Sequence, residues 1–124
     1  MRIRKRVLAL IVGVLIVSGC AQPKPLYNYN DYSDNYYTFK KDASEESTAN
    51  LQSSIEQAIG EPEKGRSGRV PPGMFANLGY LYLKGGSPKQ AVASFEREKS
   101  TYPESAHFMD RMIKKVELVE GAEK

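Results

Sequence analysis

The sequence predicts an all-α protein: a small helical domain behind an N-terminal export signal and a flexible tether. Three observations predict this fold class. From Ser44 to the end of the chain, apolar residues recur at helical spacing. Glycine and proline stand at the ends of these periodic runs, where helices stop. Two of the runs, within residues 72–105, have the spacing of an antiparallel helical hairpin, which we take as the centre of the domain.

The chain begins with a segment typical of a secretory signal. Residues 7–17 carry no charge and follow a positively charged start made of Arg2, Arg4, Lys5 and Arg6. A helix that spans a membrane needs roughly 20 apolar residues, and this run reaches only about half that length. The sequence therefore predicts a cleaved signal peptide over residues 1–19.

The only cysteine of the chain follows this signal. Val17-Ser18-Gly19-Cys20 resembles the lipobox of bacterial lipoproteins. The resemblance implies cleavage between Gly19 and Cys20 and a covalent lipid, including palmitate, on the Cys20 thiol. Because Ala21 is not the aspartate associated with inner-membrane retention, it also implies the periplasmic face of the outer membrane. The alternative is that Cys20 is an incidental thiol, or a small residue of an uncleaved anchor.

The charge of the chain argues against nucleic acid as a partner. The whole sequence has a formal charge of +3, but four positive charges lie in residues 2–6. Removal of the signal leaves a formal charge of −1, so the basic balance belongs to the signal.

The mature chain divides into three zones. Residues 20–30 are the lipidated end and a tether rich in proline and asparagine. Residues 31–43 are a tyrosine-rich segment expected to form a short helix, and residues 44–124 are the helical domain. Tyr29, Tyr32 and Tyr36 would share one helical face. Their rings either pack on the domain or form an exposed strip for a protein partner or a glycan.

The central hairpin resembles a tetratricopeptide repeat. The matching positions of its two helices are Phe75, Leu78, Gly79, Tyr82, Ala91, Phe95 and Pro103. Gly79 and Ala91 are small, which predicts that the two helices approach closely there. Leu78, Tyr82 and Phe95 would fill the space between the helices.

The turn and the last helix are predicted from local signals. Gly85 and Gly86 are expected to take left-handed angles at the helix end. Ser87 and Gln90 are expected to form a capping box at the next helix. A third helix, about residues 104–120, would cover the hairpin with a stripe of Phe108, Met112, Ile113 and Val116.

Only one full repeat is present. One repeat length before Ala91 and Phe95 stand Gln57 and Glu61, which do not match the consensus. Stacked repeats bury their faces on one another, and about three are needed for stability. We therefore expect a partner protein or self-association to cover the remaining apolar surface.

The mature chain also resembles a family of short proteobacterial lipoproteins, domain-of-unknown-function family 4810. The segments that carry this resemblance are Leu26-Tyr27, Val70-Pro71-Pro72-Gly73, Leu78-Gly79-Tyr80-Leu81-Tyr82, Tyr102-Pro103-Glu104-Ser105 and Phe108-Met109. The resemblance implies an envelope assembly shared with other lipoproteins, one of them similar to the curli-secretion channel subunit. It implies no chemistry.

The sequence offers little material for catalysis. His107 is the only histidine, the carboxylates are spread along helices, and no zinc set, phosphate-binding loop or nucleophile elbow is present. His107 is interpreted as a helix-surface or partly buried residue, and the pairs Glu96–Lys99 and Glu98–Lys99 as a solvated face. We therefore predict a non-enzymatic protein with no metal and no cofactor other than the lipid on Cys20.

Two functions remain. The first is a protein-binding subunit of an envelope lipoprotein complex, with Asn77, Tyr80, Tyr82 and Lys84 as the candidate binding residues. The second is an accessory factor that binds peptidoglycan or assists its synthesis through the tyrosine strip and the loop arginines Arg66 and Arg69.

Overall fold

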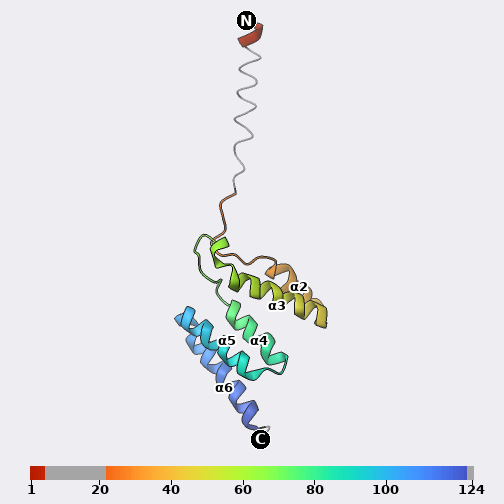
Figure 1. The fold of residues 1–124 in the computed structure, drawn as a ribbon, viewed down its shortest axis with the longest axis vertical. Helices are drawn as coiled ribbons and strands as arrows, with labels where there is room; N and C mark the ends of the chain where they lie inside the picture. The colour runs from red at the N-terminus through yellow and green to blue at the C-terminus, as the bar shows by residue number, and fades with distance from the viewer. Residues whose placement is uncertain (5–21, 123–124) are drawn as a thin grey trace.

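The computed structural model describes residues 1–4 and 22–122 (Figure 1). Residues 22–122 contain helices and no strand, which confirms the predicted all-α fold. The elements are α2 (Tyr32–Lys41), α3 (Glu45–Gly60), the 3-10 turn η1 (Pro62–Lys64), α4 (Met74–Lys84), α5 (Pro88–Thr101), the 3-10 turn η2 (Pro103–Ser105) and α6 (Ala106–Ala122). Each α-helix packs against the next one along the chain, and the contact between α4 and α5 is the most extensive.

Helix α3 begins after a capping serine and ends before a proline. The Ser44 side chain accepts a hydrogen bond from the Ser47 backbone N–H, and Glu45 and Glu46 lie in the first turn. Both features stabilise a helix start, because free N–H groups and the positive end of the helix dipole lie there. The helix ends at Gly60, before Pro62.

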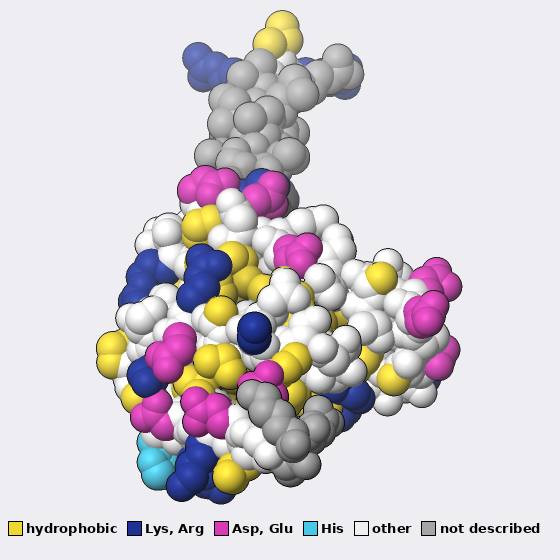
Figure 2. Space-filling view, turned by 60° about the horizontal axis from the view of Figure 1, so that its bottom comes forward, with side chains coloured by type: hydrophobic (Ala, Val, Ile, Leu, Met, Phe, Trp, Pro, Cys, Tyr) yellow, Lys and Arg dark blue, Asp and Glu magenta, His cyan; other side chains and the backbone are white. Residues whose placement is uncertain are grey.

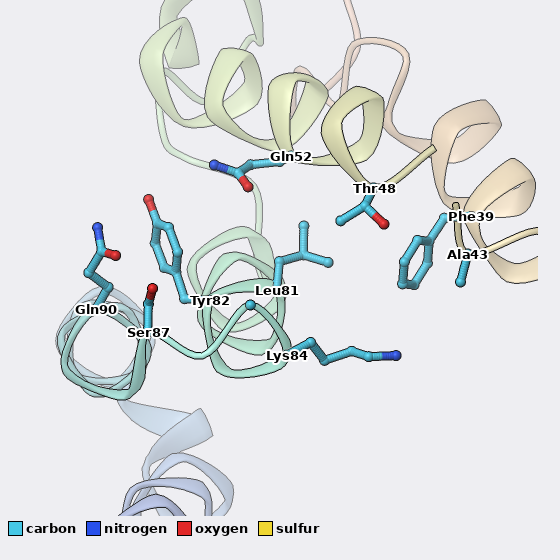
Figure 3. Close-up of a pocket in the computed structure, with 10 residues that line it drawn as sticks. Phe39, Ala43, Thr48, Gln52, Leu81, Tyr82, Lys84, Ser87 and Gln90 are labelled. Atoms are coloured by element: carbon cyan, nitrogen blue, oxygen red, sulfur yellow. The ribbon is translucent and has the colours of Figure 1, made fainter. Parts of the chain in front are cut away.

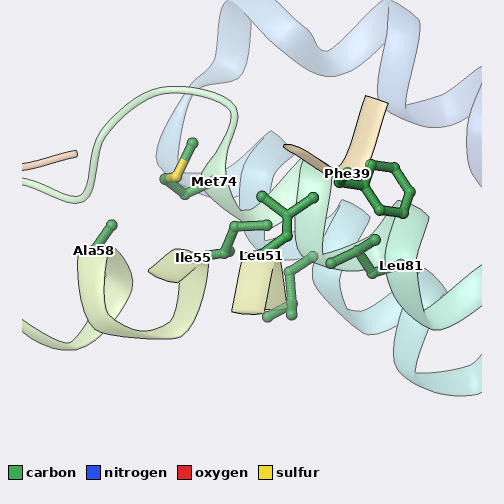
Figure 4. Packing of buried hydrophobic residues seen from close by; sticks show 7 residues of the cluster. Phe39, Leu51, Ile55, Ala58, Met74 and Leu81 are labelled. Atoms are coloured by element: carbon green, nitrogen blue, oxygen red, sulfur yellow. The ribbon is translucent and has the colours of Figure 1, made fainter. Parts of the chain in front are cut away.

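One hydrophobic cluster joins the first two helices to α4. Its buried members are Phe39, Leu51, Ile55, Ala58, Met74, Leu78 and Leu81 (Figure 4). They come from α2, α3 and α4, so Phe39 brings the tyrosine-rich helix α2 onto the domain. Full burial of one such large side chain contributes about 1.5–3 kcal/mol, which makes this cluster a main source of stability.

A second cluster joins α5 to α6. It consists of Ala91, Phe95, Met109, Ile113 and Val116. The predicted stripe on the last helix is therefore partly wrong: Met109 is buried, whereas Phe108 is 59% exposed. The physical reason is the register of α6, since Met109 precedes Ile113 by four residues and Val116 by seven and shares their face.

The close approach of α4 and α5 at Gly79 is confirmed. A Cβ atom at Gly79 would lie 2.6 Å from Cε1 of Phe95 and 3.1 Å from the carbonyl oxygen of Ala91. The glycine therefore lets the Phe95 ring lie directly against the α4 backbone.

The turn between α4 and α5 differs in two details from the prediction. Gly86 has a left-handed backbone with φ of 75°, but Gly85 has φ of −80°. Ser87 is the N-cap of α5 without a capping hydrogen bond from its side chain, so the predicted capping box with Gln90 is not formed. Pro88 at the first helical position has no N–H, so one fewer backbone donor at the start of α5 lacks a partner.

Part of the predicted tether is packed on the domain. We name residues 24–28 the N-terminal strap. Its Pro25 and Leu26 carbonyls accept hydrogen bonds from the N–H groups of Arg66 and Ser67, at 2.8 and 2.9 Å. A Cβ atom at Gly65 would lie 2.8 Å from the strap backbone at Asn28, so glycine is required for this approach. The tether boundary at residue 30 is therefore placed too late.

Candidate functional site

A groove of about 430 Å³ lies between the first two helices and the α4–α5 hairpin (Figure 3). Its lining comes from the end of α2, the first half of α3, the end of α4 and the start of α5. The lining residues are Phe39, Ala43, Thr48, Gln52, Leu81, Tyr82, Lys84, Gly85, Ser87 and Gln90. Its volume lies within the range of roughly 300–1,000 Å³ that is usual for ligand pockets.

The groove has an apolar end and a polar end. Phe39 and Leu81 lie at one end, and both belong to the first hydrophobic cluster. Gln52, Tyr82 and Gln90 lie together at the other end, with the Tyr82 hydroxyl and both amides directed into the same space (Figure 3). The groove therefore offers an apolar contact and several hydrogen-bonding groups side by side.

Most of the polar groups in the groove are free to bind something else. Within residues 22–122, the Tyr82 hydroxyl and the side chains of Ser87 and Gln90 make no hydrogen bond to protein. Gln52 donates to Glu56 Oε1 at 2.8 Å, which leaves its carbonyl oxygen as an acceptor. A partner could thus be held by several hydrogen bonds without breaking contacts within the domain.

Lys84 supplies the only charge of the groove lining. Its Nζ lies 5.7 Å from the ring centroids of both Phe39 and Tyr80. Such cation–π contacts contribute about 0.5–1 kcal/mol at exposed sites. No carboxylate among the described residues forms an ion pair with Lys84, so its charge is available to an acidic partner group.

The other two predicted binding residues line a separate, smaller hollow. Asn77 and Tyr80 face a hollow of about 120 Å³, together with Tyr36 and Lys40. Phe39 and Leu81 line both hollows, so they form the ridge between them. The Asn77 amide donates to the Gly73 carbonyl at 2.9 Å and braces the start of α4. Of the four predicted binding residues, Tyr82 and Lys84 therefore line the groove, whereas Asn77 and Tyr80 line the smaller hollow.

The tyrosines form a continuous array from the strap to α2. Successive ring centroids of Tyr27, Tyr29, Tyr32 and Tyr36 are 6.4, 6.2 and 5.6 Å apart. Tyr32 packs on the first cluster, and burial raises its pKa. Tyr36 and Tyr37 are 40% and 65% exposed. Some rings of the segment therefore pack on the domain while others are open to solvent, and binding of a partner protein or a glycan by the open rings stays a prediction.

The loop arginines have different roles. Arg66 is exposed. The Arg69 guanidinium lies over the Tyr102 ring, 4.9 Å from its centroid, and donates to the Thr101 carbonyl. Burial and the neighbouring Tyr27 hydroxyl raise the pKa of Tyr102 to about 12. Arg69 is exposed like Arg66, but its contacts with Tyr102 and Thr101 hold it in place.

The structure also corrects the interpretation of Glu98. Its side chain is only 3% exposed, and it is not part of a solvated face. The carboxylate accepts hydrogen bonds from the backbone N–H groups of Gly73 at 2.8 Å and Ala76 at 3.3 Å. The signal for this burial was present in the sequence, because Glu98 follows Ala91 by seven residues and Phe95 by three.

Several predictions concern chemistry that the described residues do not test. Gly19 and Cys20 lie outside the described residues. His107 lies on the surface of α6, as predicted. Within the described part of the chain, no three His, Cys, Asp or Glu side chains are grouped as metal ligands. No helix in that part is both long and apolar enough to cross a membrane.

A family model described as a domain of unknown function (DUF4810) matches residues 26–112. The chain belongs to the DUF4810 family. The match begins within the N-terminal strap and ends in the middle of α6, so in this chain the DUF4810 region contains the tyrosine array, the groove and Glu98. No curated protein and no solved structure matches the chain.

Proposed function

We propose that this DUF4810 protein is a non-catalytic, protein-binding subunit of an envelope lipoprotein complex. Lipid on Cys20 anchors it to the periplasmic face of the outer membrane. One partner is a lipoprotein similar to the curli-secretion channel subunit. Self-association is a second way to cover the exposed apolar surface of the DUF4810 protein.

The groove is the observation that carries this proposal. It is shared by two pairs of helices, holds free hydrogen-bonding groups beside apolar ones, and contains two of the binding residues predicted from sequence. Protein interfaces combine buried aromatic or aliphatic contacts with a polar rim in the same way.

The α4–α5 hairpin forms one wall of the groove. We assign α4 and α5 to a single tetratricopeptide-like repeat closed by α6. In support, Phe75, Leu78, Ala91 and Phe95 are buried and Gly79 lies at the closest helix approach. Helical repeats of this kind present surfaces that bind other proteins.

Photo-cross-linking in cells tests the proposal. A photoreactive amino acid replaces Lys84 in the groove, and a second variant carries it at Lys114, an exposed position on α6. We expect the Lys84 variant to capture a small set of envelope lipoproteins, including the channel-like subunit, identified by mass spectrometry. Capture of the same proteins from both positions would contradict a binding role for the groove.

The lipid anchor is tested separately. Cells grown with a clickable palmitate analogue should label the wild-type protein, and Cys20→Ser should remove both the label and the membrane association. A Cys20→Ser protein that stays in the outer-membrane fraction would contradict the anchor.

The exposed tyrosines favour a second candidate function, a cell-wall accessory factor. Tyr36 and Tyr37 offer ring surface in solution, and a polar hollow of about 150 Å³ lies between α2 and α3, lined by Asp31, Asn35, Asn50, Ser53, Ser54 and Gln57. Purified sacculi should then retain the protein, and Tyr36→Ala with Tyr37→Ala should release it. Equal retention of wild type and variant would contradict this role.

A further inference from the structure

We propose that the groove binds an extended peptide segment carrying an apolar side chain and, two residues later, a carboxylate. The apolar side chain rests on Phe39 and Leu81, and the carboxylate pairs with Lys84. This inference rests on the proposed protein-binding function and specifies which partner segment the groove accepts.

The apolar end of the groove favours an aliphatic side chain in the partner segment. Leu81 and Phe39 are buried against the protein on their inner sides, yet both line the groove. The Phe39 ring is 7% exposed and has the Lys84 ammonium near its face. The small exposed part of this ring can contact one aliphatic side chain but is too small for a sugar to stack on, which favours a peptide over a glycan.

The polar end of the groove favours a partner segment with an extended backbone. Tyr82, Ser87 and Gln90 can donate and accept hydrogen bonds, as amide and carbonyl groups of an extended chain require. In a helical partner, the backbone N–H and C=O groups bond to one another within the helix, so they would not pair with Tyr82, Ser87 and Gln90. An extended segment also places alternate side chains on one face, which sets the spacing of two residues.

The positive charge of Lys84 favours a carboxylate in the partner segment. Lys84 is the only charged residue of the lining and has no ion-pair partner among residues 22–122. On the face shown in Figure 2, acidic and basic side chains are interspersed. The proposed attraction is therefore that of Lys84 alone. An exposed pair of this kind changes affinity up to about fivefold.

Four labelled heptapeptides with glycine–serine ends provide the test. Their central residues are leucine–serine–aspartate, leucine–serine–asparagine, alanine–serine–aspartate and alanine–serine–asparagine. Fluorescence anisotropy measures their binding to the full mature lipoprotein in detergent micelles at low salt. We expect the leucine–aspartate peptide to bind best, about tenfold better than its alanine counterpart and about fivefold better than its asparagine counterpart.

Two variants of equal charge decide whether Lys84 is responsible. Lys84→Gln should abolish the preference for aspartate over asparagine, whereas Lys114→Gln on α6 should leave that preference unchanged. The inference fails if no peptide binds at about 1 mM or if Lys84→Gln keeps the aspartate preference. It also fails if chitotetraose, and no peptide, shifts the NMR signals of the Gln52 and Gln90 amides.

Failure of this inference is distinguishable from failure of the proposed function. If cross-linking from the Lys84 position captures envelope lipoproteins while the peptides show no preference, the groove binds protein in another way. If neither experiment gives a signal, the protein-binding function itself is wrong.

Discussion

Glu98 holds the start of α4 from a different helix. An α-helix begins with four N–H groups that have no partner within the helix. The N-cap of α4 is Gly73, which has no side chain to accept a hydrogen bond, and its left-handed φ of 86° favours glycine there. The buried Glu98 carboxylate takes over this role and joins α5 to the start of α4.

The first prediction concerns this carboxylate. Glu98→Gln replaces one acceptor oxygen by an amide that cannot accept, so it leaves a buried N–H group unpaired and should lower the free energy of unfolding by about 1–3 kcal/mol. Urea denaturation of the mature chain measures this loss of unfolding free energy. Glu96→Gln is the control, because Glu96 forms only an exposed ion pair with Lys99 and should lose less than about 1 kcal/mol. Equal losses would contradict the capping role.

The second prediction concerns the closest helix contact. Gly79→Leu should force Phe95 away from α4 and cost about 1–3 kcal/mol of unfolding free energy by overpacking. Gly60→Ala is the control, since a Cβ atom there meets nothing within 4 Å. Thermal unfolding by circular dichroism distinguishes the two variants. A Gly79→Leu protein that melts at the wild-type temperature would place the close contact elsewhere.

At the scale of elements, α6 covers α5 with one face and leaves the other open. Met109, Ile113 and Val116 are buried against α5, while Phe108, Leu118 and Val119 are more than half exposed. The solvent-exposed face of a surface helix is usually polar. This face of α6 is thus less polar than that of an ordinary capping helix.

The third prediction uses two neighbouring residues of α6. Met109→Ala should cost about 2–5 kcal/mol of unfolding free energy, because it opens a cavity against Phe95. Phe108→Ala removes a larger side chain from an exposed position and should cost less than about 1 kcal/mol. Chemical denaturation of both variants checks the order of the two losses. The reverse order would show that α6 packs in the other register.

Helical periodicity predicts α3, α4 and α5 from the sequence, because it depends on spacing along one element. The Gly79 contact is predicted as well, because α4 and α5 are neighbours in one short hairpin pattern. The same reasoning misplaces features that depend on two distant elements. Glu98 looks like a surface residue until α4 supplies the N–H groups that it accepts. The N-terminal strap looks like a tether because its hydrogen bonds go to residues about 40 positions away. For the groove, sequence indicates Tyr82 and Lys84 but not Gln52, which approaches from α3.

At the scale of the whole molecule, α4 belongs to both halves of the core. Met74, Leu78 and Leu81 face the first cluster, while Tyr82 packs on both clusters. The Gly79 contact and the Glu98 hydrogen bonds add further links between α4 and α5. We therefore expect neither half to keep its packing when the other half is lost.

The fourth prediction follows from this shared helix. Unfolding of the mature chain should be a single cooperative transition, with coincident curves from far-ultraviolet circular dichroism and tyrosine fluorescence. Ile55→Ala in the first cluster and Ile113→Ala in the second should both shift the whole curve to lower urea. A variant that melts in two steps would show that the halves fold independently.

The N-terminal strap limits how far the domain can stand from a bilayer. Lys24 already contacts the domain through the Glu63 carbonyl, and an extended chain advances at most about 3.6 Å per residue. With lipid on Cys20, this end of the domain would remain within about 14 Å of the membrane surface. The turn between α4 and α5, which borders the groove, lies away from the strap (Figure 1). If that anchor is present, a partner that binds the groove would have to reach past the strap side of the domain, which a protein confined to the plane of the bilayer would not do.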